Sequence, residues 1–172
     1  MEEVKKKLYM LSPLEREILD IFLKRRVSWS AHEIWTGLIN ETFSRVMQEC
    51  NKIISKGNEP NVNDFVPIEL TISKYLPPKT VTLREIQSAI KEFQERYEKA
   101  RGEKDILYSK LKFVRHFYRI PTVKKVEEGA NSLVNLGILL KTSSTDKRVK
   151  SAYYINPTFA EIYDKLEEDV NL

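Results

Sequence analysis

Polar and basic side chains able to bond phosphate oxygens or the edges of bases gather between residues 115 and 150. Lysine and arginine donate hydrogen bonds to phosphates, and threonine, asparagine and glutamate can bond base edges in a groove of a nucleic acid. The candidate binding residues are Arg115, Arg119, Thr122, Lys124, Lys125, Glu128, Asn131, Lys141, Lys147, Arg148 and Lys150. Their types and their crowding suit contact with the phosphates and base edges of a nucleic acid. The alternative is that they are solvated charges on an ordinary helix and a surface hairpin.

Residues of the kinds that enzymes and metal sites use are few and scattered. The two histidines, His32 and His116, lie far apart in the sequence, and the single cysteine, Cys50, falls on an apolar helical face, as a core thiol would. The sequence has no Cys-x-x-Cys, no His-Glu-x-x-His, no glycine-rich phosphate loop and no nucleophile elbow. We therefore expect no enzymatic activity, no catalytic residue, no bound metal and no cofactor.

Most of the candidate residues lie in a segment with the pattern of a helix followed at once by a β-hairpin. Thr122 has the type and position of a helix N-cap, and apolar residues recur at helical spacing over residues 123–134. Gly137 stands where a residue in the left-handed conformation would end the helix. After it, residues 138–141 and 151–155 are predicted to form strands on either side of a polar, basic tip.

This order of elements resembles the last third of a winged helix-turn-helix domain with a MarR/PadR-like shape, in which a recognition helix leads directly into a β-wing. The resemblance covers residues 118–157 closely. Residues 11–38, with the pattern of a helix, a short strand and a helix, also look like the first elements of such a domain. The resemblance implies a mainly α fold with small β-wings, and a recognition helix that enters the major groove of DNA.

Capping boxes predict the starts of three further helices. They are Ser12-Pro13-Leu14-Glu15, Ser30-Ala31-His32-Glu33 and Thr82-Leu83-Arg84-Glu85. The helices expected over the rest of the chain cover residues 12–25, 30–40, a separate stretch at 43–54, 82–97, 103–118 and 158–170. Residues 27–29 fit a short strand. Proline and asparagine over residues 58–79 predict a loop or linker that contains one strand or irregular wing within 65–73.

Two architectures fit these elements. In the first, two winged-helix-like units lie in tandem: a divergent unit over residues 8–77 and a second over 80–157, followed by an amphipathic helix at 158–172. In the second, one winged-helix domain is split by a helical insertion. We favour the tandem arrangement because it keeps the connection before the recognition helix short.

Composition and charge limit the classes of protein. The 172 residues, 41% hydrophobic and 31% charged, suffice for one sizeable core or two small ones. No apolar run approaches the roughly 20 residues that cross a bilayer, and the N-terminal residues lack the apolar core of a secretory signal. With only one cysteine, a cytoplasmic location without membrane contact is expected. Residues 103–150 hold 11 basic and 5 acidic side chains, an excess that suits phosphate contact.

We therefore expect a sequence-specific DNA-binding protein, a transcriptional regulator that acts as a homodimer through a recognition helix and a basic wing. The apolar stripe of the helix at 158–170 is the expected dimer contact, because a domain that ends at Pro157 does not need it. The alternative is a winged-helix adaptor that binds proteins in a transcription or replication complex. Exposed aromatic side chains would favour the adaptor, and the candidates are Trp29, Trp35, Phe117 and Tyr118.

Overall fold

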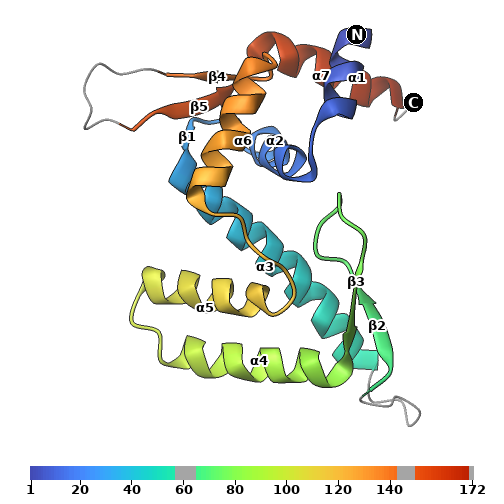
Figure 1. Ribbon diagram of the computed structural model, residues 1–172, viewed down its shortest axis with the longest axis vertical. Coiled ribbons are helices and arrows are strands. Elements are labelled where there is room, and N and C mark those ends of the chain that lie inside the picture. The colour runs from blue at the N-terminus through green and yellow to red at the C-terminus, as the bar shows by residue number, and fades with distance from the viewer. Residues whose placement is uncertain (57–64, 143–149, 171–172) are drawn as a thin grey trace. The chain divides into compact units, whose positions relative to one another are not determined.

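The part of the chain that the structure describes is mainly helical, with two small antiparallel sheets (Figure 1). A computed structural model describes residues 1–56, 65–142 and 150–170. In chain order its elements are α1 (Glu2–Met10), α2 (Pro13–Lys24), β1 (Trp29–Ser30), α3 (Ala31–Lys56), β2 (Pro67–Leu70), β3 (Lys79–Thr82), α4 (Leu83–Glu98), α5 (Glu103–Arg115), α6 (Val123–Asn135), β4 (Leu139–Lys141), β5 (Ala152–Ile155) and α7 (Pro157–Val170). The predicted fold class, mainly α with a small amount of β structure, is confirmed at this level.

The chain divides into two compact units, and they do not follow the tandem boundaries. Unit 1 is formed by residues 1–38 together with 121–172, and unit 2 by residues 39–120. Strand pairing is one cause, because β1 pairs with β5 in an antiparallel register that sets Trp29 opposite Tyr153. The compact units therefore have other bounds than the expected 8–77 and 80–157, and unit 2 interrupts unit 1 in the sequence.

Helices α2 and α3 begin where their capping boxes predict. The Ser12 hydroxyl accepts a hydrogen bond from the backbone N–H of Glu15, and the Glu15 carboxylate accepts one from the N–H of Ser12. Ser30 and Glu33 form the same reciprocal pair at the start of α3. Each box satisfies backbone donors that the first turn of a helix leaves without a partner, so both starts are determined locally.

The core of unit 1 lies between α2 and α6 and extends to the three-stranded sheet, whose strand order is β1-β5-β4. Both segments of the unit supply buried side chains, among them Ile18, Phe22 and Ile34 from the first and Leu133 and Tyr153 from the second. Their burial removes apolar surface from water, at roughly 25 cal/mol for each Å². Neither segment covers its apolar face without the other.

Helix α7 belongs to this core, which corrects the reason given for a dimer. Phe159 and Ala160 are buried, and Ile162, Tyr163 and Leu166 pack against the core with part of their surface exposed. The apolar stripe of α7 is thus largely used within unit 1. A bidentate ion pair also fixes the helix, since the Arg26 guanidinium donates to both carboxylate oxygens of Asp164, at 2.9 and 2.6 Å.

Two helices differ from the sequence-based expectation. The predicted helices at 30–40 and 43–54 are one continuous helix, α3, because no glycine-proline signal or cap interrupts the apolar spacing between them. The N-terminal helix α1 was not expected, since its sequence is rich in lysine and glutamate. It is anchored by Val4, which is buried in the core of unit 1.

Unit 2 combines the second half of α3 with the β2–β3 ribbon and the antiparallel pair α4 and α5. Its aromatic side chains pack edge to face, with the rings of Phe43, Phe93 and Phe117 all within 5.7 Å of that of Phe113, centroid to centroid. Strand β2 lies within the predicted 65–73 segment, whereas β3 was expected to be loop. The Thr82 hydroxyl caps α4, as predicted, by accepting from the N–H of Glu85.

Candidate nucleic-acid interface

Helix α6 is capped at both ends by the residues that the sequence predicts. The Thr122 hydroxyl accepts from the backbone N–H of Lys125 at 3.3 Å. At the other end Gly137 adopts a φ of +76°, the left-handed conformation that glycine reaches without steric cost. Its N–H donates to the carbonyl of Val134, and the N–H of Ile138 donates to that of Leu133, which is the Schellman pattern. The Thr122 hydroxyl therefore acts as a helix cap.

The turn at Gly137 also sets the direction of the hairpin. Asn156, at the end of β5, donates from its side-chain amide to the carbonyl of Gly137, and from its backbone N–H to that of Ile138, both at 2.9 Å. The end of α6 and the hairpin that follows it are thus joined by four short hydrogen bonds. Helix α6 and the β4–β5 hairpin are therefore fixed relative to each other.

One face of α6 is buried against α2, and the opposite face is exposed. Val126, Ala130 and Leu133 are fully buried. Gly129 is packed closely against α2, because a Cβ added there would be 2.9 Å from the Cδ1 of Ile18. The residues that the sequence assigned to the binding face are accessible to solvent, and the exposed ones are Thr122, Lys124, Lys125 and Glu128.

Asn131, the remaining candidate on this face, is half-buried and already has partners. Its side-chain oxygen accepts from the Tyr153 hydroxyl at 2.8 Å and from the Lys141 ammonium at 3.2 Å. The Lys141 nitrogen also lies 5.5 Å from the centroid of the Tyr153 ring. The structure therefore brings Asn131 and Lys141 together, as a link between α6 and the hairpin. Tyr153, which the sequence indicated only as a strand residue, completes the link, and its burial raises the pKa of its hydroxyl.

The hairpin that the sequence predicts to be a basic wing is described only in part. Lys141 ends β4, and Lys150, on the return side of the hairpin, is exposed. Lys147 and Arg148 lie outside the described residues, so their assignment to the wing stays a prediction from the sequence. Thr142 and Ala152 pair across the hairpin. The backbone N–H and the hydroxyl of Thr142 both donate to the carbonyl of Ala152, and the N–H of Ala152 donates to the Thr142 hydroxyl, at 2.8 to 3.2 Å.

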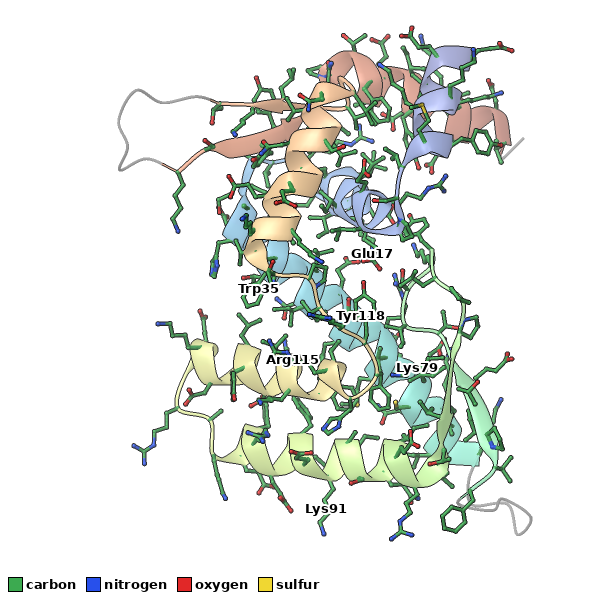
Figure 2. The ribbon with its side chains drawn as sticks, viewed as in Figure 1. Glu17, Trp35, Lys79, Lys91, Arg115 and Tyr118 are labelled. Atoms are coloured by element: carbon green, nitrogen blue, oxygen red, sulfur yellow. The ribbon has the colours of Figure 1, made fainter. Side chains whose placement is uncertain are left out.

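Arg115 and Arg119 belong to unit 2, not to the unit that contains α6. Arg115 is the last residue of α5 (Figure 2), Arg119 lies in the segment after it, and both are exposed. The sequence placed them beside the recognition helix because they precede it by only a few residues. Lys124 and Lys125 belong to unit 1.

The aromatic side chains that would favour a protein-binding adaptor are not exposed. Phe117 is 2% exposed, and Trp29, Trp35 and Tyr118 are half-buried. The indole N–H groups of both tryptophans are also occupied, since Trp29 donates to the carbonyl of Arg25 and Trp35 to that of Pro121. Trp29 and Trp35 pack against the core of unit 1, and Phe117 packs against Phe113 in unit 2.

Within residues 1–56, 65–142 and 150–170, no three histidine, cysteine, aspartate or glutamate side chains are grouped as metal ligands. Burial raises the pKa of the Cys50 thiol to about 11, which makes it a poor nucleophile at neutral pH. His116 bonds Glu92 at 2.9 Å on the surface of unit 2. Hydrogen bonding to Arg96, together with the neighbouring His116, lowers the pKa of that carboxyl group.

In the part of the chain that is described, no helix is long and apolar enough to cross a membrane.

The positive charge is distributed differently between the units than along the sequence. Unit 1 contains 14 basic and 14 acidic residues, whereas unit 2 contains 15 basic and 11 acidic ones. The net charge of +4 thus belongs to unit 2. The local excess in residues 103–150 is divided, because residues 103–120 fall in unit 2.

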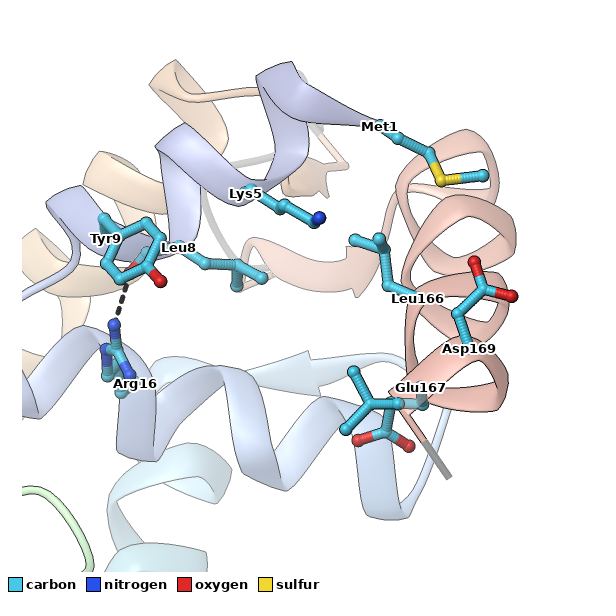
Figure 3. Close-up of a pocket in the computed structure, with 9 residues that line it drawn as sticks. Met1, Lys5, Leu8, Tyr9, Arg16, Leu166, Glu167 and Asp169 are labelled. Atoms are coloured by element: carbon cyan, nitrogen blue, oxygen red, sulfur yellow. Dashed lines mark hydrogen bonds between the residues drawn. The ribbon is translucent and has the colours of Figure 1, made fainter. Parts of the chain in front are cut away.

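A groove of about 680 Å³ lies between α1 and α7 in unit 1 (Figure 3). Helix α1 lines it with Met1, Lys5, Leu8 and Tyr9, helix α2 with Arg16, and helix α7 with Leu166, Glu167, Asp169 and Val170. One wall is therefore basic and the other acidic. Tyr9 and Val170 are each 84% exposed, more than any other large apolar residue described.

The chain matches no protein-family model, no curated protein sequence and no solved structure.

Proposed function

We propose that unit 1 is a winged helix-turn-helix domain that binds double-stranded DNA, with α6 in the major groove and the β4–β5 hairpin as the wing. The observation that carries the proposal is the order of its elements: α2, β1, the start of α3, α6, β4 and β5, with strand order β1-β5-β4. In this arrangement the helix that leads into the hairpin is the one that reads DNA. Unit 2 would be an insertion between the two helices of the motif.

The exposed face of α6 supports the assignment. Lys124 and Lys125 can donate to phosphates or base edges, and Glu128, one turn along the same face, can accept from cytosine. The bonds of Asn131 to Lys141 and Tyr153 give it a positioning role: they fix the angle between helix and hairpin. A regulator of transcription is the activity that this arrangement suits best.

The test replaces Lys124 and Lys125 together by alanine. We expect the double variant to lose at least tenfold in affinity for duplex DNA, measured by fluorescence anisotropy at two salt concentrations, while its circular dichroism spectrum stays helical. The control removes the same charge from unit 2, as Lys52→Ala with Lys56→Ala, two exposed positions of α3. Equal binding by the two double variants would reject α6 as the recognition helix. If the unaltered protein binds no duplex, the adaptor becomes the better proposal.

A homodimer also belongs to this proposal, through the groove between α1 and α7 and not through the buried stripe of α7. Across a two-fold axis, Lys5 of one copy can meet Glu167 and Asp169 of the other, and the exposed Tyr9 and Val170 can be covered. Tyr9→Glu with Val170→Glu should then give a monomer in light scattering. An unaltered protein that is monomeric at high concentration would exclude the dimer.

A further inference from the structure

Helix α5 of unit 2 is enclosed on most sides and exposes one narrow face. Ser109, Leu111, Phe113 and Val114 are buried within the unit. The side chains of Lys104, Tyr108, Lys112 and Arg115 follow one another at steps of four, four and three residues, which places them on one side of a helix. Lys104, Tyr108 and Arg115 are exposed, and Lys112 is half-buried. We call these four residues the α5 basic face.

Among the described residues, no acidic side chain forms a salt bridge with a cation of this face. The Lys112 ammonium lies 5.4 Å from the centroid of the Tyr108 ring. In the same part of the chain, Lys104 and Arg115 have no salt bridge to an acidic side chain. Asp105, at the edge of the face, accepts a hydrogen bond from the backbone N–H of Arg101 instead. The face thus combines three cations with one exposed aromatic ring.

The remaining cation of α5, Lys110, is bonded to another helix, unlike the cations of the basic face. Lys110 is half-buried, donates to the side-chain oxygen of Asn40 at 3.1 Å and lies 5.4 Å from the centroid of the Phe43 ring. It is a structural lysine that joins α5 to α3. Within the ranges that the structure describes, the cations of the basic face have no such bond to another helix, so their charges are directed to solvent.

The division of charge between the units gives this face its significance. A surface that neutralises phosphates releases condensed counterions, and that release supplies most of the sequence-independent affinity for DNA. Unit 1, with 14 basic and 14 acidic residues, has no net charge to contribute, whereas unit 2 has an excess of four basic residues. Long-range attraction to a polyanion must therefore come mainly from unit 2.

We propose that the α5 basic face is a second nucleic-acid contact surface, which binds the phosphate backbone independently of sequence. From Lys104 to Arg115 the helix rises about 16 Å, a length over which one strand of B-DNA carries about five phosphates. Tyr108, 49% exposed in the middle of the face, can pack against a sugar or stack on an unpaired base. The inference rests on the proposed function in that α6 supplies sequence recognition while α5 supplies electrostatic attraction.

The experiment compares two triple variants of the full chain. The first replaces the cations of the face, as Lys104→Gln, Lys112→Gln and Arg115→Gln. The control removes three exposed lysines elsewhere in unit 2, as Lys52→Gln, Lys56→Gln and Lys91→Gln. Binding to a duplex and to a single strand of equal length is measured by fluorescence anisotropy over a series of salt concentrations, after circular dichroism has shown that both variants are folded.

We expect the face variant to bind roughly 10- to 100-fold more weakly at low salt, and its log–log salt dependence to flatten by about two to three units, near 0.9 for each phosphate that the variant no longer neutralises. The control should keep a slope within about one unit of the unaltered protein. Equal slopes for the two triple variants would overturn the proposal. Tyr108→Ala separates the two forms of nucleic acid, because stacking on a base predicts a larger loss for the single strand than for the duplex.

The proposed function and this inference fail in different ways. If only the Lys124 and Lys125 variant loses binding, α6 reads DNA and the α5 basic face does not take part. If only the face variant loses binding, unit 2 binds nucleic acid and α6 is not a recognition helix. Absence of binding by the unaltered protein to either form would reject both.

Discussion

Asn131 shows how one side chain can determine whether a helix and a hairpin act as one surface. Its single side-chain oxygen accepts from Tyr153 on β5 and from Lys141 at the end of β4. Tyr153 is 1% exposed, so its hydroxyl depends on this acceptor. A buried hydroxyl without a partner keeps the full cost of leaving water. Asn131 therefore contributes to stability even though its position on α6 suggested a base contact.

Replacement of Asn131 by alanine should lower the free energy of unfolding by about 1–3 kcal/mol, because it leaves the Tyr153 hydroxyl buried and unpaired. Tyr153→Phe should cost less, since it removes the donor and leaves the half-buried amide able to reach solvent. The double variant should be close to Tyr153→Phe alone. Urea denaturation of the four proteins measures the coupling, and additive effects would contradict the role given to this bond.

Among the elements, the junction between α6 and β4 has the most specific local geometry. Gly137 is left-handed, and both hydrogen bonds of the Schellman turn are present. Gly137→Ala should destabilise the protein by about 1–2 kcal/mol, because an L-residue is strained at this φ. Gly37→Ala is the matched control in α3. Its new Cβ would be 3.4 Å from the Cδ1 of Ile21, and the gain in helix propensity, about 1 kcal/mol, offsets the crowding.

Equal urea midpoints for Gly137→Ala and Gly37→Ala would contradict the prediction that an L-residue is strained at position 137. A loss of DNA affinity by Gly137→Ala, beyond any loss of stability, would further indicate that the angle between helix and hairpin matters for binding. Anisotropy measured well below the unfolding transition separates the two effects.

The attachment of α7 should depend on pH through Asp164. The hydrogen bonds from Arg26 hold the pKa of this carboxyl below its usual range. A depressed folded-state pKa contributes stability that is present above the unfolded value, near 3.9, and is lost as the pH falls through the lower folded value. Asp164→Asn should therefore be less stable than the unaltered protein at pH 6, and the difference should shrink as the pH falls below about 4 and vanish below the lowered pKa of Asp164.

Urea denaturation at a series of pH values from 6 to 2 provides the measurement. Glu168→Gln, on an exposed position of the same helix, is the control for the change of charge. A difference between Asp164→Asn and the unaltered protein that persists at pH 2 would show that the pair is not the cause.

Elements whose ends are set by neighbouring residues were the ones that the sequence predicted well. The capping boxes at Ser12 and Ser30, the cap at Thr122 and the turn at Gly137 each depend on contacts within about five residues. Helix α1 was missed because its anchor, Val4, is a single buried residue in a charged stretch. The binding role of Asn131 was predicted from its helical face alone, which cannot reveal a partner on a distant strand.

At the scale of the whole molecule, the sequence could not show which elements belong together. The pairing of Trp29 with Tyr153 joins residues more than 120 positions apart, and periodicity carries no information about such a partner. The tandem arrangement was favoured because short connections are common, yet unit 1 takes both ends of the chain. The excess of basic residues over 103–150 misled in the same way, because this range crosses the boundary between the two units at residue 120.

Unit 1 should fold without unit 2. Its core contains only residues from 1–38 and 121–172, and the indole N–H of Trp35 donates to the carbonyl of Pro121 at 2.9 Å, so the two segments meet near the insertion points. A chain in which a short Gly/Ser linker replaces residues 39–120 should unfold in one cooperative transition in urea. A non-cooperative transition, or loss of the near-ultraviolet signal of its tryptophans, would show that unit 2 is needed for folding.

The discontinuity of unit 1 also has a consequence for synthesis on the ribosome. The first 38 residues emerge early, but the helix and strands that cover their apolar faces are made only after unit 2 is complete. Unit 2 is continuous in sequence and can fold as it emerges, whereas the nascent N-terminal segment must wait with Ile18, Phe22 and Ile34 uncovered. Closing so long a loop costs about 2 kcal/mol more than a ten-residue connection would. A folded unit 2 shortens the effective loop and would therefore speed the folding of unit 1. The N-terminal segment is the part of the nascent chain that most needs a chaperone.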